Sequence, residues 1–363
     1  MEIFRNGGFV FRVSPDGGEL FTDRHCTGES SHLGHGMVEY EKGRVLAFTS
    51  RNNGEYWGGH NGTGYTEMKF SEDAGKTWSE AVPFPYSKSL FDMDLGVYSA
   101  CEKAVLASDG TIIEFNLISD LIDSKGCGWE PYGRPTYLKS RDGGRTWSKA
   151  KALCSLRGRV YDARVFGGDI YVLVHQGREP SKGVLTSYHL LRSTDCGETF
   201  TDISALPFYP ALDTACYYGT MSVLHDGRLI VYVYYDRDDE KHIAYSTSGD
   251  MGLTWSRPEE AYFAKRIRNM QLIAFENSFF CFGRSGSHGE EQEQGHSIVY
   301  CSADGINWDE GHYLKYRTAS AGAYSNAIIV HDGDRQRVLY HASWAYRRSM
   351  TDVYQWFIDA ERI

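Results

Sequence analysis

The octapeptide Ser71-Glu-Asp73-Ala-Gly75-Lys-Thr77-Trp78 recurs along the chain and decides the fold. Its pattern, S-x-D-x-G-x-T-W, is called the box below. Three further copies match it closely and a fourth is one residue shorter: Ser140–Trp147, Ser193–Phe200, Ser248–Trp255 and Ser302–Trp308. Successive box aspartates lie 53 to 69 residues apart, which fits one four-stranded sheet with its loops per repeat. The chain is therefore predicted to be an array of similar sheets.

Each box has the composition of a turn between two strands. Ser and Asp side chains accept hydrogen bonds from nearby backbone amides, Gly adopts positive φ, and Thr-Trp supplies a large apolar anchor after the turn. A turn present in every repeat cannot define one unique site. The box aspartates are therefore predicted to be structural: Asp73, Asp142, Asp195, Asp250 and Asp304.

Upstream of each box, apolar runs separated by glycine turns predict three antiparallel strands, the third leading into the box. After the fifth box, residues 327–330, 337–340 and 353–357 predict three more strands without a box. The N-terminal run Gly8–Val13 is a spare strand, and its pairing with the last sheet would close a ring of six blades and remove exposed edges. The prediction is an all-β, six-bladed propeller forming one domain over residues 1–363. Long loops are predicted at Gly54 to Gly64, Ser119 to Gly133 and Ser285 to Gly295.

Composition excludes several classes of protein. The 363 residues carry a formal charge of −10, which disfavours a nucleic-acid partner. No run is long enough to span a bilayer, and the N-terminus lacks the pattern of a signal peptide, so a cytoplasmic protein without a membrane partner is expected. The eight cysteines follow no metal-binding spacing and are predicted to be buried free thiols. No metal and no cofactor is predicted.

Five boxes on six predicted blades resemble the sialidase (neuraminidase) superfamily, whose motif is called the Asp box or BNR repeat. The resemblance covers nearly the whole chain. It implies a glycoside hydrolase that releases a terminal sialic acid or a related acidic sugar from glycans. The same propeller also carries other activities, so the function needs support from the site itself.

In blade six, Gly322-Ala-Tyr324-Ser325-Asn-Ala resembles the stretch that holds the sialidase nucleophilic tyrosine. The resemblance therefore implies that Tyr324 is the catalytic nucleophile. A phenol suits a substrate whose anomeric carbon bears a carboxylate, because an anionic carboxylate nucleophile would be repelled.

Sialidases hold the substrate carboxylate with three arginines, whose planar forks pair with it. Arg51 follows the predicted second strand of blade one, where the family places one of them. Arg237 and Arg284 occupy the corresponding strand ends of blades four and five. These three arginines are predicted to bind the substrate, and Tyr218, His60 and Asp162 complete the predicted substrate-binding set.

The chain departs from the family at three positions. His35, a predicted catalytic residue, stands where the first family arginine is expected, and Tyr218 stands where the glutamate that activates the tyrosine is expected. The family acid/base aspartate after Arg51 is missing, so Glu55, with His60 as the alternative, is the predicted proton donor.

Rim carboxylates are also predicted at Asp162 and Glu102, each paired with a neighbouring arginine. If Tyr324 has no base, an inverting mechanism that uses water is the natural variant.

Two other functions remain open. A polysaccharide lyase or other glycosidase acting on uronic acids would explain His35 and the missing base, and a lyase would form an ultraviolet-absorbing product. A catalytically silent, glycan-binding propeller would bind sugar and release nothing. The oligomeric state is not predicted.

Overall fold

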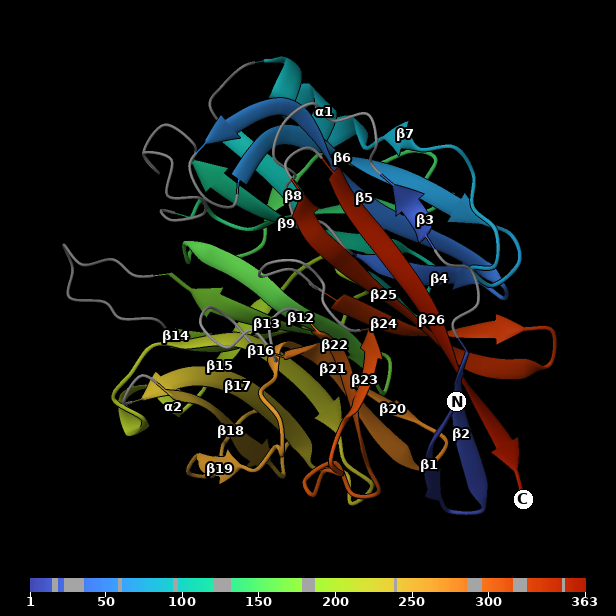
Figure 1. Cartoon of the computed structure of the whole chain (residues 1–363). Helices are drawn as coiled ribbons and strands as arrows, with labels where there is room; N and C mark the ends of the chain where they lie inside the picture. The colour runs from blue at the N-terminus through green and yellow to red at the C-terminus, as the bar shows by residue number, and fades with distance from the viewer. Residues whose placement is uncertain are drawn as a thin grey trace.

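The computed structural model describes residues 1–14, 19–22, 36–57, 61–93, 97–120, 132–177, 187–237, 240–285, 296–315, 325–347 and 350–363. Within these ranges the chain forms six antiparallel sheets (Figure 1). The innermost strand of each sheet contacts the innermost strand of the next, and the last of them contacts the first. The predicted six-bladed β-propeller is confirmed.

Five blades have four strands each, numbered outward from the centre. Blade one is β4 (Met37–Glu41), β5 (Arg44–Trp57), β6 (Asn61–Ser71) and β7 (Val82–Pro83); blade two is β8 (Val97–Leu106), β9 (Ile112–Asp120), β10 (Thr136–Ser140) and β11 (Lys151–Ala152). Blade three is β12 (Gly158–Phe166), β13 (Asp169–Gln176), β14 (Ser187–Ser193) and β15 (Thr201–Ala205). Blade four is β16 (Cys216–Val223), β17 (Leu229–Arg237), β18 (Glu240–Ser248) and β19 (Glu259–Ala261); blade five is β20 (Arg268–Phe275), β21 (Ser278–Ser285), β22 (His296–Ser302) and β23 (His312–Lys315).

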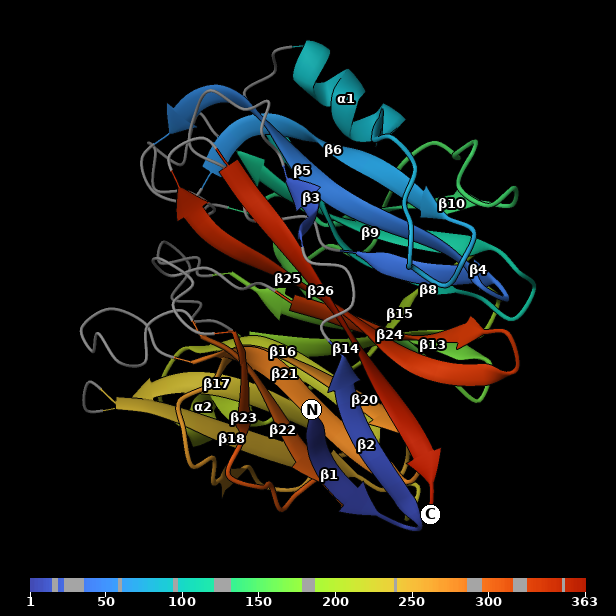
Figure 2. The same ribbon diagram turned by 45° about the vertical axis from the view of Figure 1, so that its right-hand side comes forward.

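Blade six combines both ends of the chain. It contains β24 (Ser325–Asp332), β25 (Arg335–Arg347) and β26 (Met350–Arg362), followed by β2 (Phe9–Ser14) and β1 (Glu2–Asn6), while β3 (Glu19–Thr22) also pairs with β26. β2 pairs with β26 from Phe9 opposite Arg362 to Ser14 opposite Phe357. Figure 2 shows β2 beside the C-terminal part of β26 at this seam. The predicted closure by the N-terminal strand is confirmed, and β1 adds a further strand outside it.

Each box joins the third and fourth strands of its blade, as predicted. Asp142 illustrates its bonding: Oδ1 accepts from the Thr146 amide at 2.9 Å, and Oδ2 accepts from the Thr146 hydroxyl at 2.6 Å. These bonds lower the pKa of Asp142 to about 2. The box turns also dock on the preceding blade: a Cβ added at Gly252 would lie 2.2 Å from Leu190 Cδ2 of blade three. The boxes therefore hold neighbouring blades together.

Two expectations about local structure are wrong. The loop predicted at Gly54 to Gly64 is largely a hairpin extension, because β5 runs to Trp57 and β6 begins at Asn61. The strand preference of the aromatic pair Tyr56-Trp57 outweighs the effect of the nearby glycines. Arg51 consequently lies inside β5, not after it.

In the described part of the chain, two short helices join the strands, α1 (Pro85–Asp92) and α2 (Phe208–Ala211). α1 has proline at its first position, which suits a helix start, and packs on β6 and β8. Among the described residues, no helix is both long and apolar enough to cross a bilayer.

Candidate functional site

The innermost strands of blades two to five bind one another across the axis of the ring. Lys103 of β8 donates to the Gln271 side chain of β20 in the opposite blade, and Arg164 of β12 donates to Leu272 O at 2.7 Å. Lys103 is buried, which lowers the pKa of its amine to about 8. These two hydrogen bonds cross the axis of the ring. The starts of the inner strands form one rim of the ring, called the rim below.

Four inner strands carry a β-bulge close to the rim. Their pairing registers shift at Cys101/Lys103, Val160/Asp162, Tyr217/Thr220 and Arg268/Gln271. A bulge turns a side chain away from the regular alternation of a strand. In blades four and five the bulge places Tyr218 at φ +54° and Asn269 at φ +56°. Such left-handed backbone is costly for these residues and is found disproportionately at functional sites.

The rim cluster consists of Tyr218, Tyr234, Arg268, Asn269 and Arg284. Arg268 lies over two rings, with its guanidinium carbon 5.3 Å from the Tyr218 centroid and 5.1 Å from the Tyr234 centroid. Its Nη2 donates to the Tyr218 hydroxyl at 3.2 Å. Arg284 is the register partner of Arg268, and its Nε donates to Asn269 Oδ1 at 2.9 Å. Two arginines and two tyrosines therefore share one place on the rim.

An aromatic wall continues from this cluster into blade three. The ring centroids of Tyr161 and Tyr218 are 5.5 Å apart, and buried His175 lies 5.1 Å from Tyr161 and 5.2 Å from Tyr188. Burial raises the pKa of Tyr161 and Tyr188 well above that of an exposed tyrosine. Both phenols therefore keep their protons at neutral pH, which suits a binding wall better than a base.

The two described carboxylates predicted at the rim are both bound to arginine, as expected. Arg159 Nη2 contacts both oxygens of Glu102, at 2.8 and 2.9 Å, and the Arg159 guanidinium lies 4.7 Å from the Tyr161 ring centroid. Asp162 is fully buried and forms an ion pair with Arg164 at 3.1 Å. Its Oδ2 also accepts from the Thr220 hydroxyl and the Met221 amide, both at 2.9 Å. Asp162 thus joins the inner strands of blades three and four.

The structure describes only part of the predicted site. Tyr324, His35 and His60 lie outside the described residues, and for Arg51 and Glu55 it describes only the backbone, within β5. Ser325, directly after Tyr324, donates to Asn269 O at 3.4 Å, so the start of β24 lies against the rim cluster.

The remaining predicted residues are placed as follows. Arg284 is buried in the rim cluster, and Tyr218 is part of it. Arg237 is exposed, and its guanidinium packs on Tyr235, 5.1 Å from the ring centroid. Because Tyr235 and Tyr234 are successive strand residues, they face opposite sides of blade four. Arg237 therefore packs on the side facing blade three, and Arg268 on the side facing blade five.

Arg268 was not predicted as a site residue from the sequence. It stands at the start of its inner strand, as Arg159 does in blade three. Comparison of the residues that begin each inner strand would have found both.

A buried carboxyl group between blades one and two was also missed. Glu114 of β9 is fully buried, and Asn116 donates to its Oε2. Burial raises the pKa of Glu114 to about 8. The folded protein therefore holds this proton at pH values where an unfolded chain has lost it. Stability from this proton is fully present below pH 4.5, the ordinary value, and is lost as the pH rises through about 8.

Glu114→Gln should therefore flatten the pH dependence of stability. The free energy of unfolding of the parent protein should fall relative to the variant between pH 5 and 8, by roughly 1 kcal/mol per pH unit. Chemical denaturation at several pH values measures this difference, with exposed Glu80→Gln as the control. A parent-to-variant difference that does not change with pH would contradict a buried proton on Glu114.

Comparison with solved structures supports the six-bladed fold. The sequence matches no protein-family model and no curated protein. A structure titled as a protein of unknown function from Dyadobacter fermentans superposes with a TM-score of 0.69 at 17% identity, covering 99% of this chain and 97% of that one.

Sialidases superpose as well. A mutant of the NanB sialidase from Streptococcus pneumoniae gives a TM-score of 0.65 at 13% identity, with 95% of this chain and 70% of that one covered. The sialidase of Trypanosoma rangeli gives 0.58 at 13% identity, with 91% and 55% covered. The chain thus has the six-bladed β-propeller fold seen in sialidases.

Proposed function

We propose that this protein is an exo-glycosidase of sialidase type that releases a terminal sialic acid or a related acidic sugar from glycans. The observation that carries this proposal is the rim cluster, in which Arg268 lies on Tyr218 and Tyr234 and pairs in register with Arg284. Guanidinium groups bind carboxylates through two parallel hydrogen bonds, and adjacent aromatic rings limit the surrounding water. An acidic sugar matches both features.

The hydrogen bond across the axis of the ring favours a substrate whose acidic sugar is at the end of a glycan. Gln271 lies three positions further along β20 than Arg268 and is bound by Lys103 from the opposite blade. This hydrogen bond would obstruct the passage of a sugar chain through the ring at this level. This favours a terminal residue over the middle of a polysaccharide.

In this proposal Tyr324 attacks the anomeric carbon, and Glu55 protonates the departing oxygen. Arg51, Arg284 and Arg268 are the candidates for holding the carboxylate, because Arg237 packs on the other side of blade four. The contact of Ser325 with Asn269 supports a position for Tyr324 close to the rim cluster. Tyr218 takes the place of the family glutamate and offers Arg268 a hydroxyl group in its stead.

Turnover of a fluorogenic sialoside by the full chain tests this proposal, together with Tyr324→Phe. The parent protein should release the fluorophore and free sialic acid, and the variant should lose at least ~100-fold in kcat. Failure to cleave sialosides and sialylated glycans would overturn the activity. Full turnover by Tyr324→Phe would remove the tyrosine from its role.

A glycan-binding propeller without activity is the second candidate. It is favoured because the two described rim carboxylates, Glu102 and Asp162, both form ion pairs with arginines. Neither is available as an acid or a base. Saturable binding of sialyllactose in a calorimetric titration, with no free sialic acid formed, would favour this second candidate.

A further inference from the structure

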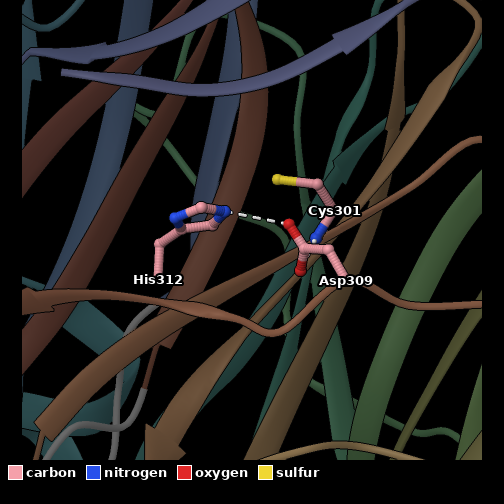
Figure 3. Close-up of side chains that lie close together, drawn as sticks. All are labelled: Cys301, Asp309 and His312. Carbon is pink, nitrogen blue, oxygen red and sulfur yellow. Dashed lines mark hydrogen bonds and ion pairs between the residues drawn. The ribbon is translucent and has the colours of Figure 1, made fainter.

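Three side chains of blade five converge at the end of the sheet opposite the rim (Figure 3). Cys301 lies near the end of β22, Asp309 follows the last residue of the fifth box, and His312 begins β23. One thiol sulfur, one carboxylate oxygen and one imidazole nitrogen all lie within 4.8 Å of one another. Cys301 is buried, while the side chains of Asp309 and His312 are 22% and 33% exposed.

The repeats show what Asp309 replaces. In blades one, two and four a serine directly follows the box tryptophan, and its hydroxyl accepts from the amide of the residue before the box. The bonds are Phe70 N to Ser79, Lys139 N to Ser148 and Thr247 N to Ser256, each 3.0 Å long.

In blade five the same bond runs from Cys301 N to Asp309 Oδ1, also at 3.0 Å. Asp309 Oδ1 therefore accepts the hydrogen bond that the serine hydroxyl accepts in blades one, two and four. The other oxygen, Oδ2, contacts His312 Nε2 at 2.9 Å.

The positions of Cys301 and His312 also differ from their counterparts. Where blade five has Cys301, the other four boxes are preceded by Phe70, Lys139, Arg192 and Thr247. Where it has His312, four residues after the last box position, they have Val82, Lys151, Ser204 and Glu259. The turn forms without a thiol, an imidazole or a second carboxylate oxygen. The combination in blade five therefore goes beyond what the turn requires.

We propose that Cys301, Asp309 and His312 bind one Zn²⁺ ion, which fastens β23 to β22 at a position separate from the rim. Thiolate, imidazole and carboxylate are the ligand types that zinc selects, and a water molecule can complete the tetrahedron on the exposed side. One thiolate and one carboxylate balance the charge of the dication. Zinc would hold the ligand atoms about 3.5 Å apart, so the site needs a shift of only about 1 Å.

Neighbouring groups prepare this site for a metal. Asp309 Oδ1 accepts from the amides of Cys301 and Gly311, each at 3.0 Å, which fixes the carboxylate and leaves Oδ2 for the ion. On binding, the thiol proton leaves to solvent, the imidazole proton moves from Nε2 to Nδ1, and bonds to zinc form at the freed atoms.

Titration of the metal-free full chain with Co²⁺ tests the site, because a thiolate ligand gives cobalt a charge-transfer band that zinc abolishes when it displaces the cobalt. One equivalent of Co²⁺ should produce the band, and one equivalent of Zn²⁺ should remove it. Asp309→Ser restores the residue found in three other repeats, so it keeps the bond to the Cys301 amide. It should nevertheless weaken Zn²⁺ binding by more than ~10-fold.

Two cysteine variants complete the test. Cys301→Ser should lose the charge-transfer band, whereas Cys196→Ser, in the box of blade three, should keep it. At one equivalent, Zn²⁺ should raise the melting temperature of the parent and of Cys196→Ser, and should raise that of Asp309→Ser by less. No band in the parent protein, or an equal band in Asp309→Ser and Cys301→Ser, would overturn the proposal. Sialoside turnover by Asp309→Ser should equal that of the parent, which separates this site from the rim.

Discussion

Arg268→Ala should lower kcat/KM on a sialoside by about 100-fold, equivalent to roughly 3 kcal/mol of lost transition-state binding. The guanidinium of Arg268 lies on two tyrosine rings and is bound by one of their hydroxyls, so it is held in one orientation before substrate arrives. Little side-chain entropy remains to be lost when it pairs with a carboxylate. Its removal therefore costs nearly the full value of the interaction.

Arg268→Lys distinguishes the contribution of the two parallel guanidinium hydrogen bonds from that of the positive charge. A lysine keeps the positive charge but cannot form two parallel hydrogen bonds with a carboxylate. We expect a loss of about 10-fold, between the parent and the alanine variant. The loss should be much smaller on a substrate whose carboxylate has been converted to an amide, because the lost partner is then already missing.

Arg257→Ala is the matched control. Arg257 is an exposed arginine that follows the fourth box, at the end of the blade opposite the rim. It should keep the activity of the parent, and all variants should keep the parent's melting temperature within a few degrees. An Arg268→Ala protein that is folded and retains kcat/KM within twofold would show that the rim cluster does not bind the sugar carboxylate.

The fold could be predicted from the sequence because every blade carries its own marker. The box is local: its Ser, Asp, Gly and Thr bond within eight residues, so the turn can be recognised without knowledge of its neighbours. Since each box marks one blade, the number and even spacing of the boxes give the number of blades. The closing strand followed from the same count, since the sixth sheet lacked one strand.

The rim was less predictable because its residues come from different repeats and depend on irregular backbone. Arg268 and Tyr218 are 50 residues apart, and only the packing of β16 against β20 brings them together. The bulge at Tyr218 is marked only by the adjacent Gly219, and the bulge at Asn269 contains no glycine, so the sequence gives little sign of either. The resemblance to sialidases directed attention to the ends of strands, whereas Arg268 is the first and Arg159 the second residue of an inner strand.

The pairing of β22 with β23 explains why the cluster of Cys301, Asp309 and His312 was not predicted from the sequence. The serine-to-aspartate change after the fifth box is visible in the sequence, but its meaning depends on the pairing of β22 with β23. Val299 lies opposite His312, which brings the imidazole to the Asp309 carboxylate beside Cys301. Spacing along the chain does not show this convergence.

Arg159→Met should destabilise the fold by about 3–5 kcal/mol near neutral pH, because it leaves the Glu102 carboxylate buried without its counter-charge. Both side chains of this pair are almost fully buried, at 4% and 6% exposed. Arg192→Met in the same blade is the matched control, because Arg192 also pairs with a carboxylate and lies over a tyrosine ring. Its side chain is 35% exposed, so it should cost less than about 1 kcal/mol.

The pH dependence of Arg159→Met follows from the proton on Glu102. Burial already raises the pKa of Glu102 in the parent, and loss of the Arg159 charge raises it further. The folded variant then binds a proton more tightly than its unfolded chain, so its deficit should be smallest below about pH 4 and grow as the pH rises. Glu102→Gln combined with Arg159→Met should recover most of the loss, since no buried charge remains. Urea denaturation at pH 4.5 and 7.5 measures these differences, and a variant within 1 kcal/mol of the parent at both values would show that the pair contributes little to the fold.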